Sequence, residues 1–211
     1  MKTCVAALMA ASCLYASTAD AQNIFGQLQK MAGQSSTPSQ GNAVVNAASF
    51  YASFLAARIE MNQAQIELAR AFDLKDQVTL LQTEQTRLQG GALDANGLKE
   101  STVLSNNVDA AIQDKIQQKA VLNDEGKSHF KAAMPHLIIG TLLTVKLIGE
   151  GKQALASSAM IEKIALLASL KDMPGFVKSV VYSYRMVFAY GKENNIQMPA
   201  NASDALGSLG E

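Results

Sequence analysis

One face of the segment between residues 47 and 71 is apolar throughout. Its apolar positions follow one another at alternating steps of three and four residues, and they mix small with large side chains. Such steps bring side chains to one face of an α-helix, and their alternation is the pattern of a heptad seam that packs against another helix. The segment therefore predicts a long amphipathic helix in an all-α fold. The seam consists of Ala47, Phe50, Phe54, Ala57, Met61, Ala64, Leu68 and Ala71, and Leu55, Ile59 and Ile66 widen it.

The seam changes phase after Phe72. Two interpretations remain open: Asp73 caps a second helix, or one helix continues with a local distortion. A continuous helix over residues 42–89 would be about 72 Å long. In both cases the helical pattern ends at Gly90-Gly91. We expect 42–89 and 98–125 to pair across this turn as a long antiparallel helical hairpin, in an elongated bundle.

The most apolar part of the chain follows residue 129. Gly126 interrupts the preceding pattern, and Pro135 suits the first turn of a helix, so we expect a core helix to begin near Pro135. The apolar block 137–148 contains Lys146 and is shorter than the roughly 20 residues of a membrane span. We therefore interpret it as a buried core helix.

Two more helical patterns cover residues 160–170 and 176–192. The sequence thus predicts five or six helices in one all-α domain over residues 42–195. The residues that follow, 196–211, are small and polar, and we expect them to form a flexible C-terminal tail.

Residues 1–21 have the pattern of a bacterial signal peptide. Lys2 precedes an apolar run of 12 residues, and Ala19-Asp20-Ala21 places small residues at a cleavage site after Ala21. A transmembrane anchor and lipidation at Cys13 are the alternatives, but the run is short for a membrane span and the bulky residue expected before a lipidated cysteine is missing. We expect a periplasmic or secreted mature protein, which would contain no cysteine and hence no disulfide or thiol site.

A short arm and a linker precede the predicted domain. Residues 22–32 have an amphipathic helical pattern, and residues 33–41 consist of Gly, Ser, Gln, Thr and Pro, which favour a flexible coil. The arm is too short to be stable alone, so we expect it to dock on its own bundle, on a partner or on a membrane surface. Lys30 is its only charged residue, so its attraction to a membrane should be weak, and docking on a protein surface is favoured. Its apolar side chains are Ile24, Phe25, Leu28 and Met31.

Composition excludes several classes of partner. The 18 basic and 18 acidic side chains cancel, which leaves no electrostatic footprint for nucleic acid. Tryptophan is absent and aromatic residues make up only 6% of the chain, which is unfavourable for an aromatic platform under a sugar or a base.

The candidate metal ligands are Asp124, Glu125, His129 and His136. Glu125 and His129 have the i, i+4 spacing of helical ligands. Gly126 and Pro135 would separate these side chains, however, so we interpret the histidines as partly exposed residues at a helix junction and predict no metal site.

Nucleotide binding and nucleophilic catalysis lack their motifs. Gly149-Glu150-Gly151-Lys152 resembles part of a phosphate loop, but Lys146 stands where its first glycine belongs and Gln153 stands where it needs Ser or Thr. No G-x-S-x-G motif accompanies the two histidines. We therefore predict no catalytic or cofactor-binding residues and no enzymatic activity, although a hydrolase that uses unmarked carboxylates stays open.

Methionine and phenylalanine side chains have two interpretations, a core or an adaptable apolar groove. The core is favoured. The residues concerned are Met61, Met134, Met160, Met186, Phe50, Phe54 and Phe130.

These patterns favour an exported helical protein that acts through contacts with a protein partner or with further copies of itself. Envelope assembly, secretion and surface structures are the settings in which such a protein would act. The alternative is a periplasmic carrier of an apolar ligand, such as a lipid, between the helices of residues 135–195.

Overall fold

The computed structural model describes residues 47–90, 95–157 and 173–200, together with positions 167, 171, 202 and 207. These residues belong to the second of two compact units, Val44–Glu211. The predicted signal peptide, arm and linker lie outside the described residues, as does nearly all of the predicted helix 160–170. The elements are α2 (Ala47–Ala71), α3 (Lys75–Gln89), α4 (Ala95–Gln117), α5 (Asp124–Ser157) and α7 (Met173–Glu193). The described residues contain no strand, and the predicted all-α bundle is confirmed.

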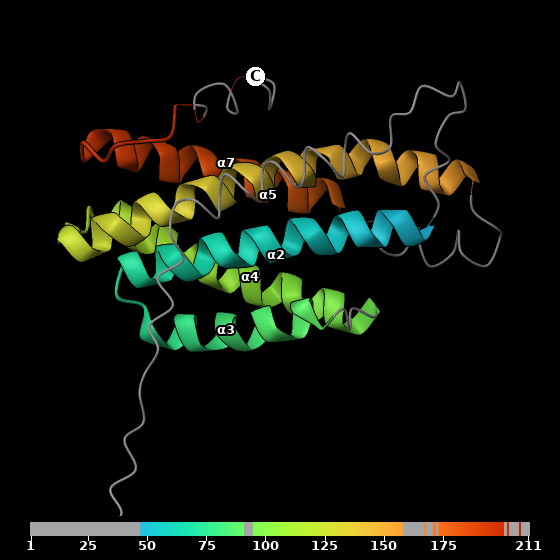
Figure 1. Ribbon diagram of the computed structural model, residues 1–211, viewed down its shortest axis with the longest axis horizontal. Coiled ribbons are helices and arrows are strands. Elements are labelled where there is room, and N and C mark those ends of the chain that lie inside the picture. The colour runs from blue at the N-terminus through green and yellow to red at the C-terminus, as the bar shows by residue number, and fades with distance from the viewer. Residues whose placement is uncertain are drawn as a thin grey trace, which may run out of the picture. The chain divides into compact units, whose positions relative to one another are not determined.

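Helix α2 is the central element of the bundle. It packs against α3, α4 and, most extensively, α5, and Figure 1 shows it between α5 and α3. The predicted seam is confirmed, because each of its positions from Phe50 to Ala71 is at most 7% exposed. Burial continues around the whole helix between Met61 and Ala69, where only Gln63 is partly exposed.

The chain reverses direction after α2. Asp73 has a left-handed backbone with φ of 55°, and the N–H of Leu74 donates to the carbonyl of Ala69 at 2.8 Å. This is the hydrogen bond of a Schellman motif, which ends a helix. Helix α3 then runs back along α2, and Asn62 Nδ2 donates to the carbonyl of Leu81 at 2.9 Å. Residues 42–89 therefore contain two helices that form a short antiparallel hairpin.

The long antiparallel pair is α2 with α5, which differs from the predicted pairing of 42–89 with 98–125. His129 Nδ1 lies 2.7 Å from Glu67 Oε2, and His136 Nδ1 lies 2.8 Å from Glu60 Oε2. These contacts fix the register between the two helices. In this register small residues that recur every seven positions face one another, with Ala57, Ala64 and Ala71 on α2 and Gly126, Ala133 and Gly140 on α5, all of them buried.

Glycine at two of these positions permits the close approach of α5 to α2. A Cβ atom on Gly126 would lie 2.8 Å from the carbonyl oxygen of Ala71, and one on Gly140 would lie 2.8 Å from Met61 Sδ and 3.0 Å from its backbone nitrogen. All three distances are shorter than van der Waals contact. The small residues at the contact thus explain why α2 packs more extensively against α5 than against the other helices.

Helix α5 begins earlier than the sequence predicts and includes Pro135. Asn123 Oδ1 accepts a hydrogen bond from the N–H of Gly126 at 2.7 Å, so an asparagine N-cap starts the helix and Gly126 does not interrupt it. Pro135 removes the hydrogen bond to the carbonyl of residue 131. Lys131 is exposed, so solvent can satisfy that carbonyl.

One side of α5 is buried and the other is exposed. Leu137 and Leu147 are at most 2% exposed, whereas Leu142 and Ile148 are each 38% exposed. Length and apolar composition alone would allow this one helix of the described part to cross a membrane, but 44% of its apolar window is buried in the bundle.

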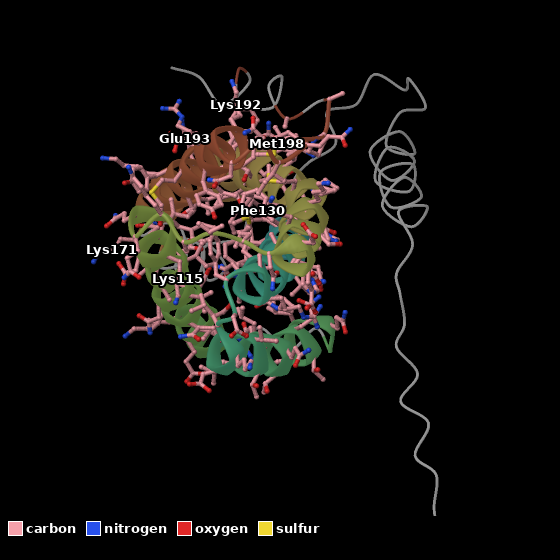
Figure 2. All side chains as sticks on the ribbon, turned by 90° about the vertical axis from the view of Figure 1, so that its left-hand side faces the viewer. Lys115, Phe130, Lys171, Lys192, Glu193 and Met198 are labelled. Carbon is pink, nitrogen blue, oxygen red and sulfur yellow. The ribbon has the colours of Figure 1, made fainter. Side chains whose placement is uncertain are left out.

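Of the predicted flexible tail the structure describes residues 196–200, 202 and 207, and Ile196, Met198 and Ala202 among them pack on the core, so the prediction was wrong for these three residues. Ile196 and Ala202 are at most 4% exposed, and Tyr184 donates a hydrogen bond to the carbonyl of Ala202 at 2.8 Å. Met198 lies over Gly191 and beside Phe130, in a space that a Cβ on Gly191 would fill (Figure 2). The absence of a side chain at Gly191 therefore gives the returning chain a place on the bundle.

Candidate functional site

The four candidate metal ligands, for which the sequence predicts no metal site, do not come together. Among the described residues no group of three His, Cys, Asp or Glu side chains is close enough to hold a metal ion. His129 and His136 instead pair with Glu67 and Glu60 on α2. These partners were not predicted from the sequence. The signal for them was that the two glutamates and the two histidines have the same spacing of seven residues.

The residues that resemble a phosphate loop lie inside α5. Gly149, Gly151 and Lys152 are helical, and Glu150 Oε1 pairs with Lys146 Nζ at 3.1 Å. Backbone N–H groups within a helix donate to the preceding turn, so they are not available to cradle a phosphate.

The methionine and phenylalanine residues largely fill the core. Met61, Met134, Phe50, Phe54 and Phe130 are at most 5% exposed, Met186 is partly exposed, and Met160 lies outside the described residues. The favoured interpretation, a core rather than a groove, is confirmed for the five buried side chains.

A row of buried polar residues follows the face of α2 that points towards α3 and α4. Arg58, Asn62 and Gln65 are each 1% exposed, and we call them the polar ladder. Arg58 Nη2 donates to Ser101 Oγ at 2.6 Å and to the carbonyl of Ser101 at 2.8 Å. Asn62 Nδ2 donates to Gln85 Oε1 at 2.7 Å. The ladder thereby connects α2 to both covering helices.

The third member of the ladder extends this network to α7. Gln65 Nε2 donates to Ser105 Oγ and to Asp109 Oδ1, both at 2.7 Å. Ser183 on α7 donates to Asp109 Oδ2 at 3.2 Å. The partners on α4 are Ser101, Ser105 and Asp109, which are four residues apart and so share one helix face.

The polar ladder was not foreseen, because polar side chains opposite an apolar seam are typical of a solvated helix face. The sequence feature that could have predicted these contacts is the four-residue spacing of Ser101, Ser105 and Asp109 on α4.

The charges of this network balance one another. Burial lowers the pKa of Arg58 to about 10, so its guanidinium stays cationic at neutral pH, and it also lies 5.5 Å from the ring centroid of Phe176. Burial raises the pKa of Asp109, against the hydrogen bonds from Gln65 and Ser183. Burial also acts to raise the pKa of Glu84, but hydrogen bonds from Arg87 and Ser101 outweigh it and lower that pKa.

These interactions assign the network a structural role. Arg87 holds both oxygens of Glu84 at 2.8 Å, a bidentate geometry that fixes both side chains. The serine hydroxyls are engaged by Arg58, Gln65 and Asp109, and none of the histidine contacts involves them. The network has no nucleophile beside an imidazole base.

An open cleft of about 840 Å³ lies at the end of the bundle where α2 ends and α5 begins. The turn between α2 and α3 forms one wall, and the connection between α4 and α5 forms the other. Phe72 and Leu122 contribute buried apolar surface, whereas Val121 is 89% exposed. Charged residues of both signs line the cleft: Arg70, Lys75 and Lys115 are basic, and Asp73 and Glu125 are acidic. Figure 2 looks onto this end of the bundle and labels Lys115.

Three helices end here with the same backbone motif. The residues after α2, α4 and α7 have left-handed φ angles without being glycine, and the next N–H donates to a carbonyl five residues earlier, as in a Schellman motif. The left-handed residues are Asp73, Lys119 and Asn195, with φ of 55°, 52° and 54°, and the donors are the N–H groups of Leu74, Ala120 and Ile196. Two of these turns form the walls of the cleft, so its shape is fixed by backbone hydrogen bonds.

No family model, curated protein or solved structure matches this chain. The function of this chain must therefore be inferred from its own geometry. The cleft is the concave surface that this geometry offers to another molecule.

Proposed function

We propose that this protein is a non-enzymatic, exported helical protein that acts through protein–protein contacts, as an accessory of envelope assembly, secretion or surface structures. The observation that carries the proposal is the cleft at the end of the bundle. Val121 at the cleft is 89% exposed beside the buried side chains of Phe72 and Leu122. Contact with a partner would remove this apolar side chain from water.

Charge around the cleft supports a protein as the partner. Three basic and two acidic residues line it, so neither sign dominates. Charged groups of both signs orient a partner and suppress incorrect ones, whereas a polyanion favours a surface of one sign.

The polar chemistry of the described residues supports a non-enzymatic role. Both histidines are bonded to glutamates of α2, and the buried Asp109 is bonded to Gln65 and Ser183. Groups that would serve as acids or bases elsewhere hold helices together here. The proposal of export depends on residues 1–21 alone.

Native mass spectrometry of the protein, purified gently from the cells that encode it, tests the proposal. We expect a complex of defined stoichiometry with a protein partner or with further copies of the chain. Val121→Asp should abolish the complex, and Val103→Asp should retain it, because Val103 is also exposed, at 52%, but lies outside the cleft.

A bare monomer would contradict the proposal, as would a complex that Val121→Asp leaves intact. Co-purified lipid would instead favour the carrier of an apolar ligand.

A further inference from the structure

A second, small cavity lies between the helices, and its lining residues differ from those of the solvent-open cleft. Residues of α2, α4, α5 and α7 line it, and its volume is about 10 Å³. This is close to the volume that a single water molecule requires and far below that of a drug-sized ligand. Its polar lining residues are Gln65, Asp109, Gln113 and Ser183.

Each member of the polar ladder has one buried atom without a hydrogen-bond partner in the protein, namely Arg58 Nη1, Asn62 Oδ1 and Gln65 Oε1, and of these three residues only Gln65 lines the cavity. Gln65 is 1% exposed, and its Oε1 accepts no hydrogen bond from another protein group. Its Nε2 is fully used by Ser105 and Asp109, so the amide is held in place and cannot rotate without losing those bonds. Buried polar atoms in folded proteins almost always have a partner, from the protein or from ordered water.

The other polar residues of the cavity complete a set of donors and acceptors. Asp109 Oδ2 accepts one hydrogen bond, from Ser183 at 3.2 Å, and a carboxylate oxygen can accept another. Gln113 Nε2 lies 3.5 Å from Ser183 Oγ, which is the outer limit of a hydrogen bond and leaves its donor capacity weakly used. A buried water typically makes about three hydrogen bonds.

We propose that one buried water molecule occupies this cavity. It donates to Gln65 Oε1 and to the carboxylate of Asp109, and it accepts a hydrogen bond from Gln113. The water thereby joins the polar ladder of α2 to α4 at the point where α7 packs against them. Asp109 lines the cavity, and the nearby guanidinium of Arg58 interacts with its carboxyl group. The positive charge of Arg58 offsets the negative charge of this carboxylate, which favours a neutral ligand over a cation in the cavity.

A crystal structure of the full chain at a resolution near 1.5 Å tests the proposal directly. We expect one fully occupied solvent peak in the cavity, within hydrogen-bond distance of Gln65 Oε1 and of at least one further polar group. A cavity without density would overturn the proposal, as would a direct hydrogen bond from Gln113 to Gln65 Oε1. Crystals soaked in rubidium chloride should show no anomalous peak there, and such a peak would identify a cation instead of water.

Two variants extend the test to solution. Val187→Ile adds a methyl group to the cavity lining, and it should expel the water and lower the midpoint of urea unfolding. Val180→Ile is the control, because Val180 is buried on the same helix at 2% exposure but does not line the cavity. A higher midpoint for Val187→Ile than for the wild type would show that the added methyl group fills a dry void, and it would overturn the proposal.

Discussion

Gly140 and Gly149 provide a matched test of the close approach between α2 and α5. Both lie inside α5, so replacing either by alanine removes the same conformational freedom from the unfolded chain and improves helix propensity equally. A Cβ on Gly149 meets no atom within 4 Å. Gly149→Ala should therefore stabilise the protein by about 0.5–1 kcal/mol.

Gly140→Ala should have the opposite effect. Its Cβ would lie 2.8 Å from Met61 Sδ, 2.9 Å from Met61 Cγ and 3.0 Å from the backbone nitrogen of Met61. Met61 is 1% exposed, so its side chain cannot move out into solvent, and the backbone nitrogen at 3.0 Å belongs to α2 and can shift only with that helix. Overpacking of this kind costs about 1–3 kcal/mol, which exceeds the gain in propensity.

Urea unfolding followed by circular dichroism measures both free energies of unfolding. We expect the two variants to move in opposite directions from the wild type. If Gly140→Ala stabilised the protein as much as Gly149→Ala, α2 and α5 would not be in close contact at this point.

Two further predictions concern the helix ends and the polar network. Lys119→Gly should stabilise the protein by about 0.5–1 kcal/mol, because a left-handed conformation costs an L-residue more than glycine loses in unfolded-state entropy. The control is Gln117→Gly, which lies in the last turn of α4 and should destabilise the protein. Equal effects of the two substitutions on urea unfolding would refute the Schellman motif after α4. Burial raises the pKa of Asp109 above its ordinary value of 3.8, so the folded state binds its proton more tightly than the unfolded state and wild-type stability falls as the pH rises through this window. Asp109→Asn has no such proton and should gain stability relative to the wild type as the pH rises above about 4. A difference that is independent of pH would contradict the buried position of this carboxyl group.

The seam of α2 was predictable because it is a local signal. Steps of three and four residues report which face of a helix is buried, and the seam residues from Phe50 to Ala71 are indeed buried. The partner of that face was not predicted, because a seam does not specify what covers it. That information lay in the small residues that recur every seven positions on α5, namely Gly126, Ala133 and Gly140.

The predicted start of α5 was wrong because tertiary contacts outweighed the local helix propensities of glycine and proline. Gly126 was interpreted as the end of a helical pattern, but it lies inside α5 at a point where a side chain would come too close to the carbonyl oxygen of Ala71. Pro135 was expected near the start of a helix, but it lies inside α5. Lys131 is exposed, so solvent can replace the hydrogen bond that its carbonyl loses.

The cleft and the polar ladder could not be predicted from the sequence for a different reason. The cleft is built from two turns, and its Val121 carries no periodic signal. Polar residues such as Arg58 and Gln65 have side chains typical of a solvated face, and their hydrogen bonds to the serines and aspartate on α4 make their burial favourable.

The reversal of the chain at Asp73 is the central structural claim, because it places α3 and α4 over the polar ladder and leaves α2 enclosed. Double electron–electron resonance between spin labels at Ala52→Cys and Gln89→Cys tests it, in a chain whose native Cys4 and Cys13 are replaced by serine. Both labelled positions are exposed.

With α3 folded back along α2 at a normal interhelical distance, the labels should lie about 15–30 Å apart. A continuous helix through Asp73 would separate them by about 56 Å. A distribution centred near the longer distance would contradict the enclosed α2 and the bundle built around it.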